Sequence, residues 1–235
     1  MFDGHFRADA ERKLKPVGQQ LRRTGITADH LTLVGVVMAF GAALAIGNGA
    51  LRLGLVLLVL TALPDVLDGA VAKASGTASP RGAFFDSVAD RFTDALLLGG
   101  VAWHLSTTQT GRIAVLPMAV LAASMLISYE RAKAEALGFD AKGGVMERAE
   151  RLVALAFGLL FHQFLVPILW LMLGLTLLTA AQRFLKVWKQ ATAENAVLAA
   201  KVKERRRERA RRTDRRVARS TARRVRRRSQ MRLPR

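Results

Sequence analysis

Long apolar blocks separated by short polar stretches fill this 235-residue chain between about residues 30 and 188. A helix needs about 20 mostly apolar residues to cross the hydrocarbon core of a bilayer. Six segments approach that length, at about 30–49, 51–72, 84–105, 113–134, 149–164 and 165–187. Runs such as LRLGLVLLVLTAL and FLVPILWLMLGLTLLTAA lack a polar face, which argues against the alternative of a soluble six-helix bundle. The pattern predicts an all-α integral membrane protein with six transmembrane helices.

Lysine and arginine indicate which side of the membrane each loop faces. Residues 1–28 carry six of them, and the loops near 73–82 and 131–151 carry seven more. The turns on the opposite side hold only Arg52 and Arg112. Because positive charge collects in cytoplasmic loops, we expect a multi-pass protein of the cell (plasma) membrane. Both termini and the two basic loops are expected in the cytoplasm.

The two ends of the chain differ from its apolar middle, so we expect an arm (1–28), a membrane domain (29–189) and a tail (190–235). The arm is basic and partly amphipathic, and it either lies on the membrane surface as an interfacial helix or is solvated. Residues 201–235 hold 18 basic residues against three acidic ones, in a chain of net charge +19. Such a tail suits anionic lipid headgroups or solvent. Its lack of aromatic residues for base stacking argues against nucleic acid.

Four aspartates at the predicted ends of the second and third membrane helices are the most informative residues. They form two pairs with spacings of three and four, so each pair shares one helical face. A short link with Gly, Ser and Pro joins the two helices as a hairpin and brings together Asp65, Asp68, Asp86 and Asp90. Crowded carboxylates at a membrane boundary need a positive partner, and hard divalent cations provide one. The chain has no cysteine, and no histidine lies near these aspartates, which argues against zinc.

The alternative for any single aspartate of this set is a helix cap or an ion pair with Arg81 or Arg91. The whole segment from Pro64 to Asp90, however, resembles the signature of the CDP-alcohol phosphatidyltransferase family, D-x2-D-G-x2-A-R-x8-G-x3-D-x3-D. One position departs, because Lys73 stands where the family has arginine. Lysine keeps the charge but lacks the planar fork that binds a phosphate through two hydrogen bonds. The family's six membrane helices agree with the hydropathy pattern over about residues 20–190, and the resemblance also implies a homodimer.

The resemblance implies roles for the residues of this signature. Two Mg2+ or Mn2+ ions would be held by Asp65, Asp68, Asp86 and Asp90, and Asp90 would also act as general base on the attacking hydroxyl. CDP-diacylglycerol would contact the signature and the start of the first helix, through Asp29, His30, Leu31, Thr32, Gly69, Ala72, Lys73, Ser79 and Gly82. For residues 29–32 a helix start capped by Thr27 or Asp29 is also expected.

Basic residues of the loop at 128–152 and of the last helix bear on the second substrate. The stretches SYERAKAE and ERAERL, with Gln182 and Arg183 before a Val-Trp pair, resemble the bacterial phosphatidylinositol-phosphate synthase branch of the family. Several arginines around one pocket suit a phosphorylated alcohol. The candidates for binding its phosphate are Arg131, Lys133, Arg148, Arg151 and Arg183. Their alternative role is to set the topology as cytoplasmic positive charge.

These features predict an enzyme that transfers the phosphatidyl group of CDP-diacylglycerol to a phosphorylated polyol and releases CMP. Inositol phosphate is the favoured acceptor, and glycerol phosphate is the alternative within the same class. A cation transporter is an alternative from another class, but the aspartates lie near the membrane surface rather than at the midplane. A membrane tether that acts through the basic tail is a further alternative.

Overall fold

The computed structural model of the chain describes residues 27–62 and 79–195. Within these two ranges the regular secondary structure is helical, with no strand, so the predicted all-α fold is confirmed. The helices are α2 (Ala28–Gly47), Leu51–Ala62, α4 (Pro80–Thr108), α5 (Val115–Ala136), α6 (Arg148–Leu160) and a last helix, His162–Asn195, which starts with the 3-10 turn His162–Phe164. Each of the six predicted segments overlaps one of them.

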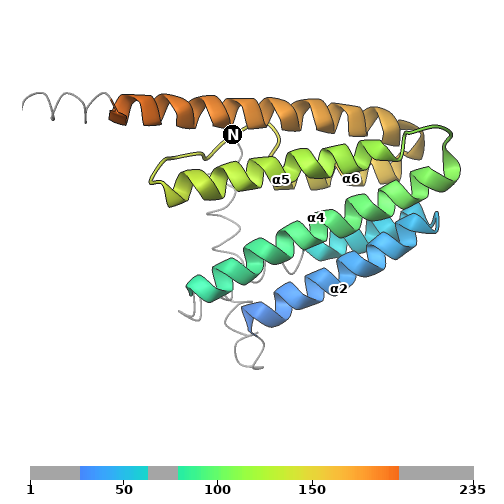
Figure 1. Ribbon diagram of the computed structural model, residues 1–235. Coiled ribbons are helices and arrows are strands. Elements are labelled where there is room, and N and C mark those ends of the chain that lie inside the picture. The colour runs from blue at the N-terminus through green and yellow to red at the C-terminus, as the bar shows by residue number, and fades with distance from the viewer. Residues whose placement is uncertain (1–26, 63–78, 196–235) are drawn as a thin grey trace, which may run out of the picture.

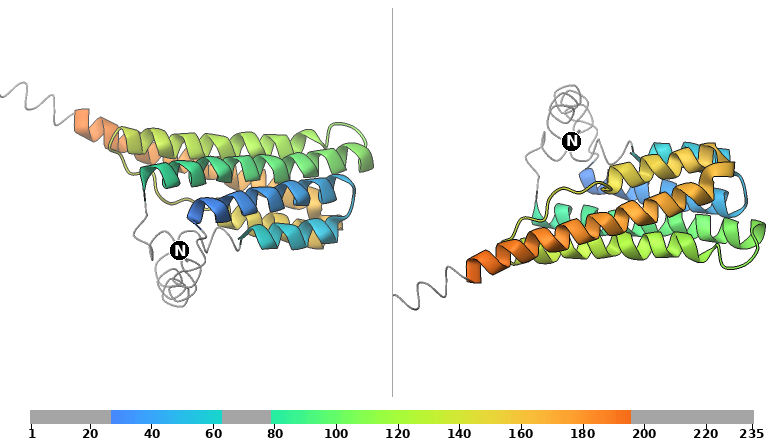
Figure 2. Two further views of the ribbon diagram at one scale, coloured as in Figure 1. Left: turned by 90° about the horizontal axis from the view of Figure 1, so that it is seen from below. Right: turned by 90° about the horizontal axis from the view of Figure 1, so that it is seen from above.

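Successive helices run antiparallel to one another (Figure 1 and Figure 2). The turn after α2 passes through Gly49, which has a φ of 83°, a value that glycine adopts at low cost. There the N–H groups of Gly49 and Ala50 donate to the carbonyls of Ile46 and Ala45, at 2.9 and 2.8 Å. These two bonds satisfy the last carbonyls of α2 and send the chain directly into the Leu51–Ala62 helix.

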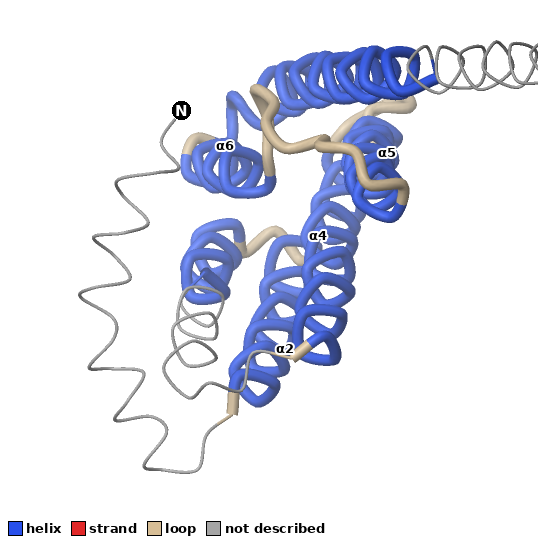
Figure 3. The backbone as a smooth tube through the Cα atoms, turned by 90° about the vertical axis from the view of Figure 1, so that its left-hand side faces the viewer, coloured by secondary structure: helices blue, strands red, loops and turns tan. Residues whose placement is uncertain are grey.

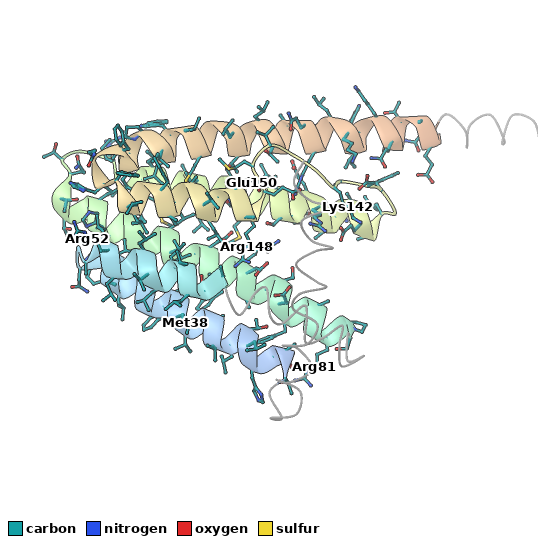
Figure 4. All side chains as sticks on the ribbon, turned by 180° about the vertical axis from the view of Figure 1, so that it is seen from behind. Met38, Arg52, Arg81, Lys142, Arg148 and Glu150 are labelled. Carbon is teal, nitrogen blue, oxygen red and sulfur yellow. The ribbon has the colours of Figure 1, made fainter. Side chains whose placement is uncertain are left out.

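Helix α4 lies between α2 and α5 when the bundle is seen end-on (Figure 3). Toward the end where α4 begins, α2 and α4 diverge from α5 and the last helix (Figure 1). Arg52 and Arg81 lie at opposite ends of the bundle (Figure 4). This arrangement is what the predicted hairpin requires, because the two arginines were assigned to opposite sides of the membrane.

Small residues allow α2 and α4 to approach each other closely. A Cβ atom added at Gly100 would lie 2.6 Å from the carbonyl oxygen of Ala43, so only glycine fits between these backbones. Nearer the turn, a Cβ at Gly47 would collide with the indole ring of Trp103. Such small-residue contacts are typical of helix packing in membranes, where dispersion contacts replace the hydrophobic effect.

In the part of the chain that the structure describes, three helices are long and apolar enough to cross a membrane: α2, α5 and the last helix. Helix α4 has the length, but Asp86, Asp90, Arg91 and Asp94 make its first half polar. Helix α6 has 13 residues, which extend over roughly 20 Å at 1.5 Å per residue, less than the hydrocarbon core. The predicted count of six membrane spans therefore stays a prediction.

The outer surface of the bundle is apolar. Val37, Phe84, Val153 and Trp170, from four different helices, are each more than half exposed. A water-soluble protein rarely exposes so many large apolar side chains, whereas in a membrane such side chains contact the apolar chains of the lipids. The helical backbone satisfies its own hydrogen bonds, as a membrane requires, and these features together describe an all-α membrane protein.

Candidate active site

Side chains cap the starts of α2 and α4. The Thr27 hydroxyl oxygen accepts a hydrogen bond from the N–H of His30 at 3.3 Å, and the His30 ring accepts one from the N–H of Thr27. The Ser79 hydroxyl oxygen accepts a hydrogen bond from the N–H of Gly82 at 3.1 Å. The predicted helix cap at the start of α2 is confirmed, with Thr27 as the capping residue.

These two helix starts lie next to each other. Arg81 on α4 forms an ion pair with Asp29 on α2 at 3.6 Å, and a Cβ at Gly82 would lie 3.9 Å from the Asp29 carboxylate. Leu31 and Thr32 follow along α2, where the buried Thr32 hydroxyl donates to the carbonyl of Ala28 at 3.1 Å. The residues predicted to contact CDP-diacylglycerol that the structure describes therefore gather at one junction: Asp29, His30, Leu31, Thr32, Ser79 and Gly82. The remaining three, Gly69, Ala72 and Lys73, lie outside the described residues.

Asp86 and Asp90 are one helical turn apart on α4, and both are partly buried. The Asp90 carboxylate forms an ion pair of 2.8 Å with Arg148 on α6 and one of 3.2 Å with Arg91. The pairing with Arg91 that was expected as an alternative therefore does occur. The Asp90 carboxylate is thus paired with the guanidinium groups of both Arg91 and Arg148.

The described residues supply two of the four predicted metal ligands, because Asp65 and Asp68 lie outside them. Within residues 27–62 and 79–195, no group of three or more His, Asp or Glu side chains is placed to hold a metal ion. Asp86 and Asp90 nevertheless have the right chemistry, since two carboxylates one turn apart provide the oxygen donors that a hard divalent cation prefers. The residues present therefore fit such an ion.

The first turn of α6 carries two arginines that face α4. Arg148 and Arg151 are three residues apart and Asp90 and Asp94 four apart, so each pair shares one helical face. Arg148 extends toward α4 (Figure 4) and lies 3.5 Å from Asp94, in addition to its contact with Asp90. Arg151 donates to Asp94 at 3.0 Å, and both of these side chains are 7% exposed. Two cations at a helix N-terminus oppose the helix dipole, and the aspartates of α4 offset that cost.

A small pocket lies between α4, α6 and the last helix. Asp94 and Arg151 form its polar part, and Leu97, Leu155 and Met172 are among its apolar walls. Charges beside such walls are weakly screened by water, so the attraction between Asp94 and Arg151 is stronger here than at a surface.

Arg183, on the last helix, is buried and binds three residues, one on α5 and two in the loop before α6. Its guanidinium donates to the carbonyls of Gly143 and Ile127 at 2.9 and 3.1 Å, and to the carboxylate of Glu147 at 3.0 Å. Glu147 is the residue before α6. Arg183 therefore reaches the start of the helix that carries Arg148 and Arg151.

The loop between α5 and α6, residues 137–147, is fixed to one face of the last helix. Thr179 accepts from the N–H of Met146 at 3.0 Å, and Gln190 bonds to both the N–H and the carbonyl of Asp140, at 3.0 and 2.7 Å. Lys186 donates to the Asp140 carboxylate at 2.8 Å. That bond, with one from the N–H of Lys142, lowers the pKa of Asp140 below its ordinary value. The loop thus sets where α6 begins.

The last two candidates for acceptor binding lie near the end of α5. Arg131 is exposed and forms an ion pair with Glu135 at 3.0 Å, one helical turn away. Lys133 is exposed in the final turn of the helix. In the structure, Arg148 and Arg151 therefore contact residues of α4, and Arg183 contacts the residue before α6. Arg131 and Lys133 lie exposed on the surface. Binding of a phosphate by any of the five stays a prediction.

Sequence interpretation gave no role to Asp94 or Glu147, although both contact the predicted arginines. The signal for Asp94 was its spacing, because Asp86, Asp90 and Asp94 recur every four residues along one face of α4. Glu147 directly precedes Arg148, but its contact with Arg183 joins residues 36 apart in the sequence. Such a contact depends on how the helices pack and has no local signature.

Comparison with known proteins identifies the family. The family model described as CDP-alcohol phosphatidyltransferase matches residues 25–188. The chain is 34% identical to a phosphatidylinositol phosphate synthase of Corynebacterium glutamicum, over 83% of this chain and 92% of the relative. It is 33% identical to an archaetidylinositol phosphate synthase of Methanothermobacter thermautotrophicus, over 79% of this chain and 93% of the relative.

Solved structures agree with the sequence relatives. The crystal structure of phosphatidylinositol phosphate synthase from Mycobacterium tuberculosis with CDP-DAG bound is similar with a TM-score of 0.70 and 31% identity, covering 75% of this chain and 94% of that one. The same protein in complex with manganese and citrate also gives a TM-score of 0.70. The chain therefore belongs to the CDP-alcohol phosphatidyltransferase family.

Proposed function

We propose that this protein transfers the phosphatidyl group of CDP-diacylglycerol to inositol phosphate, giving phosphatidylinositol phosphate and CMP. The observation that carries the proposal is the direct contact between α4 and α6, where Asp90 and Arg148 lie 2.8 Å apart. Helix α4 bears the second half of the family's aspartate signature, and α6 bears two arginines suited to an anionic acceptor. The contact supports a site in which both substrates meet.

The names of the relatives support the choice of acceptor. The bacterial relatives are phosphatidylinositol phosphate synthases and the archaeal relative is an archaetidylinositol phosphate synthase. These names differ in the lipid and share inositol phosphate. The chain is 34% identical to the bacterial relative and 33% identical to the archaeal one. Because inositol phosphate is common to these two relatives, it is the simplest acceptor to propose for this chain.

The chemistry is a displacement at phosphorus. A hydroxyl oxygen of the acceptor forms a bond to the lipid-side phosphorus of CDP-diacylglycerol, and the bond from that phosphorus to the oxygen of CMP breaks. The Asp90 carboxylate takes the hydroxyl proton. A carboxylate is a weak base for an alcohol, so holding the hydroxyl close to it in the correct direction contributes much of the rate. Arg148 and Arg151 bind the acceptor's own phosphate, and Arg183 fixes the start of α6, which carries them.

The junction of α2 and α4 is proposed to bind the nucleotide lipid. Asp29, Ser79 and Gly82 meet there. A Cβ at Gly82 would make only ordinary contacts with the described residues, so protein packing there does not demand glycine. Close approach of a ligand to the α4 backbone is the reason we propose for it.

Two divalent ions, Mg2+ or Mn2+, are proposed to be held by Asp65, Asp68, Asp86 and Asp90. When bound, such ions neutralise charge on the diphosphate and orient the leaving group. The complex of the tuberculosis relative with manganese supports a divalent cation. The carboxylates described on α4 supply oxygen donors only, which favours these ions over zinc.

We also propose that the protein spans the cell membrane several times, with the site and both termini in the cytoplasm. The separation of Arg52 from Arg81 along the bundle (Figure 4) supports this orientation, since the basic loops lie toward the Arg81 end. A homodimer is proposed from the family resemblance alone. Chemical cross-linking in native membranes tests it, and a product of monomer size only would contradict it.

Release of CMP by purified protein in detergent tests the proposed function. CDP-diacylglycerol and Mg2+ are supplied with inositol phosphate, inositol or glycerol phosphate in parallel, and EDTA serves as the metal control. Inositol phosphate should support turnover at least about tenfold better than inositol, because each lost charge-assisted bond costs about 1.5–3 kcal/mol. Equal rates with inositol and inositol phosphate would contradict the acceptor assignment, and turnover with glycerol phosphate alone would establish the alternative acceptor.

A further inference from the structure

Asp94 is a buried carboxylate that the family signature does not include, because the signature ends one helical turn earlier at Asp90. Its side chain is 7% exposed, and it lies inside α4 rather than at a helix end. A buried carboxylate is costly unless it is paired and hydrogen-bonded. Its presence therefore requires an explanation in terms of its partners.

The partners of Asp94 are the two arginines of α6. Its Oδ2 accepts from Arg151 at 3.0 Å, and its Oδ1 lies 3.5 Å from Nε of Arg148. One carboxylate thus contacts both guanidinium groups with a different oxygen for each. Arg148 also contacts Asp90, so these ion pairs connect Asp94 to the carboxylate assigned as the base.

Stability alone is a weak reason to keep such a group. Buried ion pairs are often replaceable by apolar residues without loss of stability, and apolar side chains already line this pocket. An aspartate can instead fix the orientation of an arginine side chain. A flexible arginine held by a fixed carboxylate presents its remaining N–H donors in one orientation. A guanidinium has five N–H donors, and Arg151 uses two of them, on Asp94 and on the carbonyl of Met146.

We propose that Asp94 is a positioning residue that determines acceptor specificity, by holding Arg148 and Arg151 in the orientation in which they bind the acceptor's phosphate. This inference rests on the proposed function. Asp94 does not touch the substrate and acts through the two arginines. It belongs to the acceptor side of the site only, so its loss should leave the binding of CDP-diacylglycerol unaffected.

The test is the kinetics of Asp94→Asn, which preserves the shape of the side chain and removes its charge. At saturating Mg2+ the KM for inositol phosphate should rise about tenfold or more, the effect of losing roughly one charge-assisted bond. The KM for CDP-diacylglycerol should stay within about twofold, a split that general loss of stability would not produce. Gly99→Ala is the control, because a Cβ atom at that position of α4 meets nothing within 4 Å, so the KM for inositol phosphate should stay unchanged.

Asp94→Glu keeps the inference testable if the asparagine variant does not fold. Glutamate retains the charge but moves it by one methylene, so the KM for inositol phosphate should rise above the wild-type value while the KM for CDP-diacylglycerol stays within about twofold. An unchanged acceptor KM in a folded variant of an active enzyme, or an equal rise in both KM values, would overturn the inference alone. A wild-type protein that releases no CMP with inositol phosphate would instead overturn the proposed function, and the inference with it.

Discussion

Helix α4 is joined to its two neighbours by different kinds of contact. On the α2 side the backbones meet directly, because Gly100 leaves no room for a side chain against Ala43. On the α6 side Asp90 and Asp94 face Arg148 and Arg151 in a set of ion pairs. One helix thus has a close-packed face along part of its length and a charged face along another part.

The two kinds of contact differ in what they can exchange. Two backbones in contact have no alternative partner, so the α2–α4 junction keeps its geometry whether or not a ligand is present. Charged groups can exchange a protein partner for a substrate phosphate or a cation, provided that they do not have to move far. The close-packed face therefore suits a fixed frame, and the charged face carries the groups proposed to take part in the reaction.

The largest effect on activity is expected from Asp90→Asn, which changes the charged face of α4. Asparagine keeps the size of the side chain but cannot take the hydroxyl proton, so kcat should fall by about 10²–10⁴, the usual contribution of a general base. Binding of CDP-diacylglycerol, measured by its effect on the thermal unfolding midpoint, should persist. Glu135→Gln, which removes a carboxylate from an exposed ion pair on α5, should keep near-normal kcat. Near-normal turnover of Asp90→Asn at saturating substrates would contradict the base assignment.

Removal of one buried partner on the same face should destabilise the fold. Arg151→Ala leaves Asp94 buried without its closest cation, and such a loss costs about 3–5 kcal/mol. The double variant Asp94→Leu/Arg151→Leu should recover most of this stability, since it removes both charges, but it should not recover affinity for inositol phosphate. The measurement is the free energy of unfolding in detergent for both variants. A double variant as unstable as Arg151→Ala would show that the arginine contributes through packing rather than charge.

More of the charged face of α4 than of its close-packed face could be predicted from the sequence. The helices, the aspartates on α4 and the arginines on α6 follow from local periodicity and spacing, because a helix fixes which residues share a face. The pairing of Asp94 with Arg151 does not follow, since these residues are 57 apart in sequence and their contact depends on how α4 and α6 pack together. The same reason hid the contacts of Arg183 with Gly143 and Glu147. Glycines that permit close approach, such as Gly100, also look like any other glycine in an apolar run.

The close-packed face is tested by Gly100→Ala. A Cβ there would lie 2.6 Å from the Ala43 carbonyl oxygen, so the two helices must separate, and overpacking of this kind costs about 1–3 kcal/mol. Gly99→Ala is the matched control, because a Cβ at that position meets nothing within 4 Å. It should be neutral or slightly stabilising through helix propensity. Equal unfolding free energies for the two variants would show that α2 and α4 are farther apart than the structure has them.

The smallest effect is expected from a third kind of contact, the exposed ion pair of Asp140 with Lys186, which holds the α5–α6 loop. The hydrogen bond from Lys186 lowers the pKa of Asp140 in the folded protein, whereas in the unfolded chain the pKa is near its ordinary value of about 3.9. A lowered folded pKa means that the contribution to stability is present above about pH 4 and is lost as the pH falls through the folded value. The difference in unfolding midpoint between the wild type and Asp140→Asn should therefore be constant from pH 8 to pH 5 and vanish at lower pH. Lys186→Met should remove the same pH-dependent difference, and the double variant should behave like either single one. A difference that persists below the folded pKa of Asp140 would show that the loop is held by the Gln190 hydrogen bonds, with no contribution from the charge.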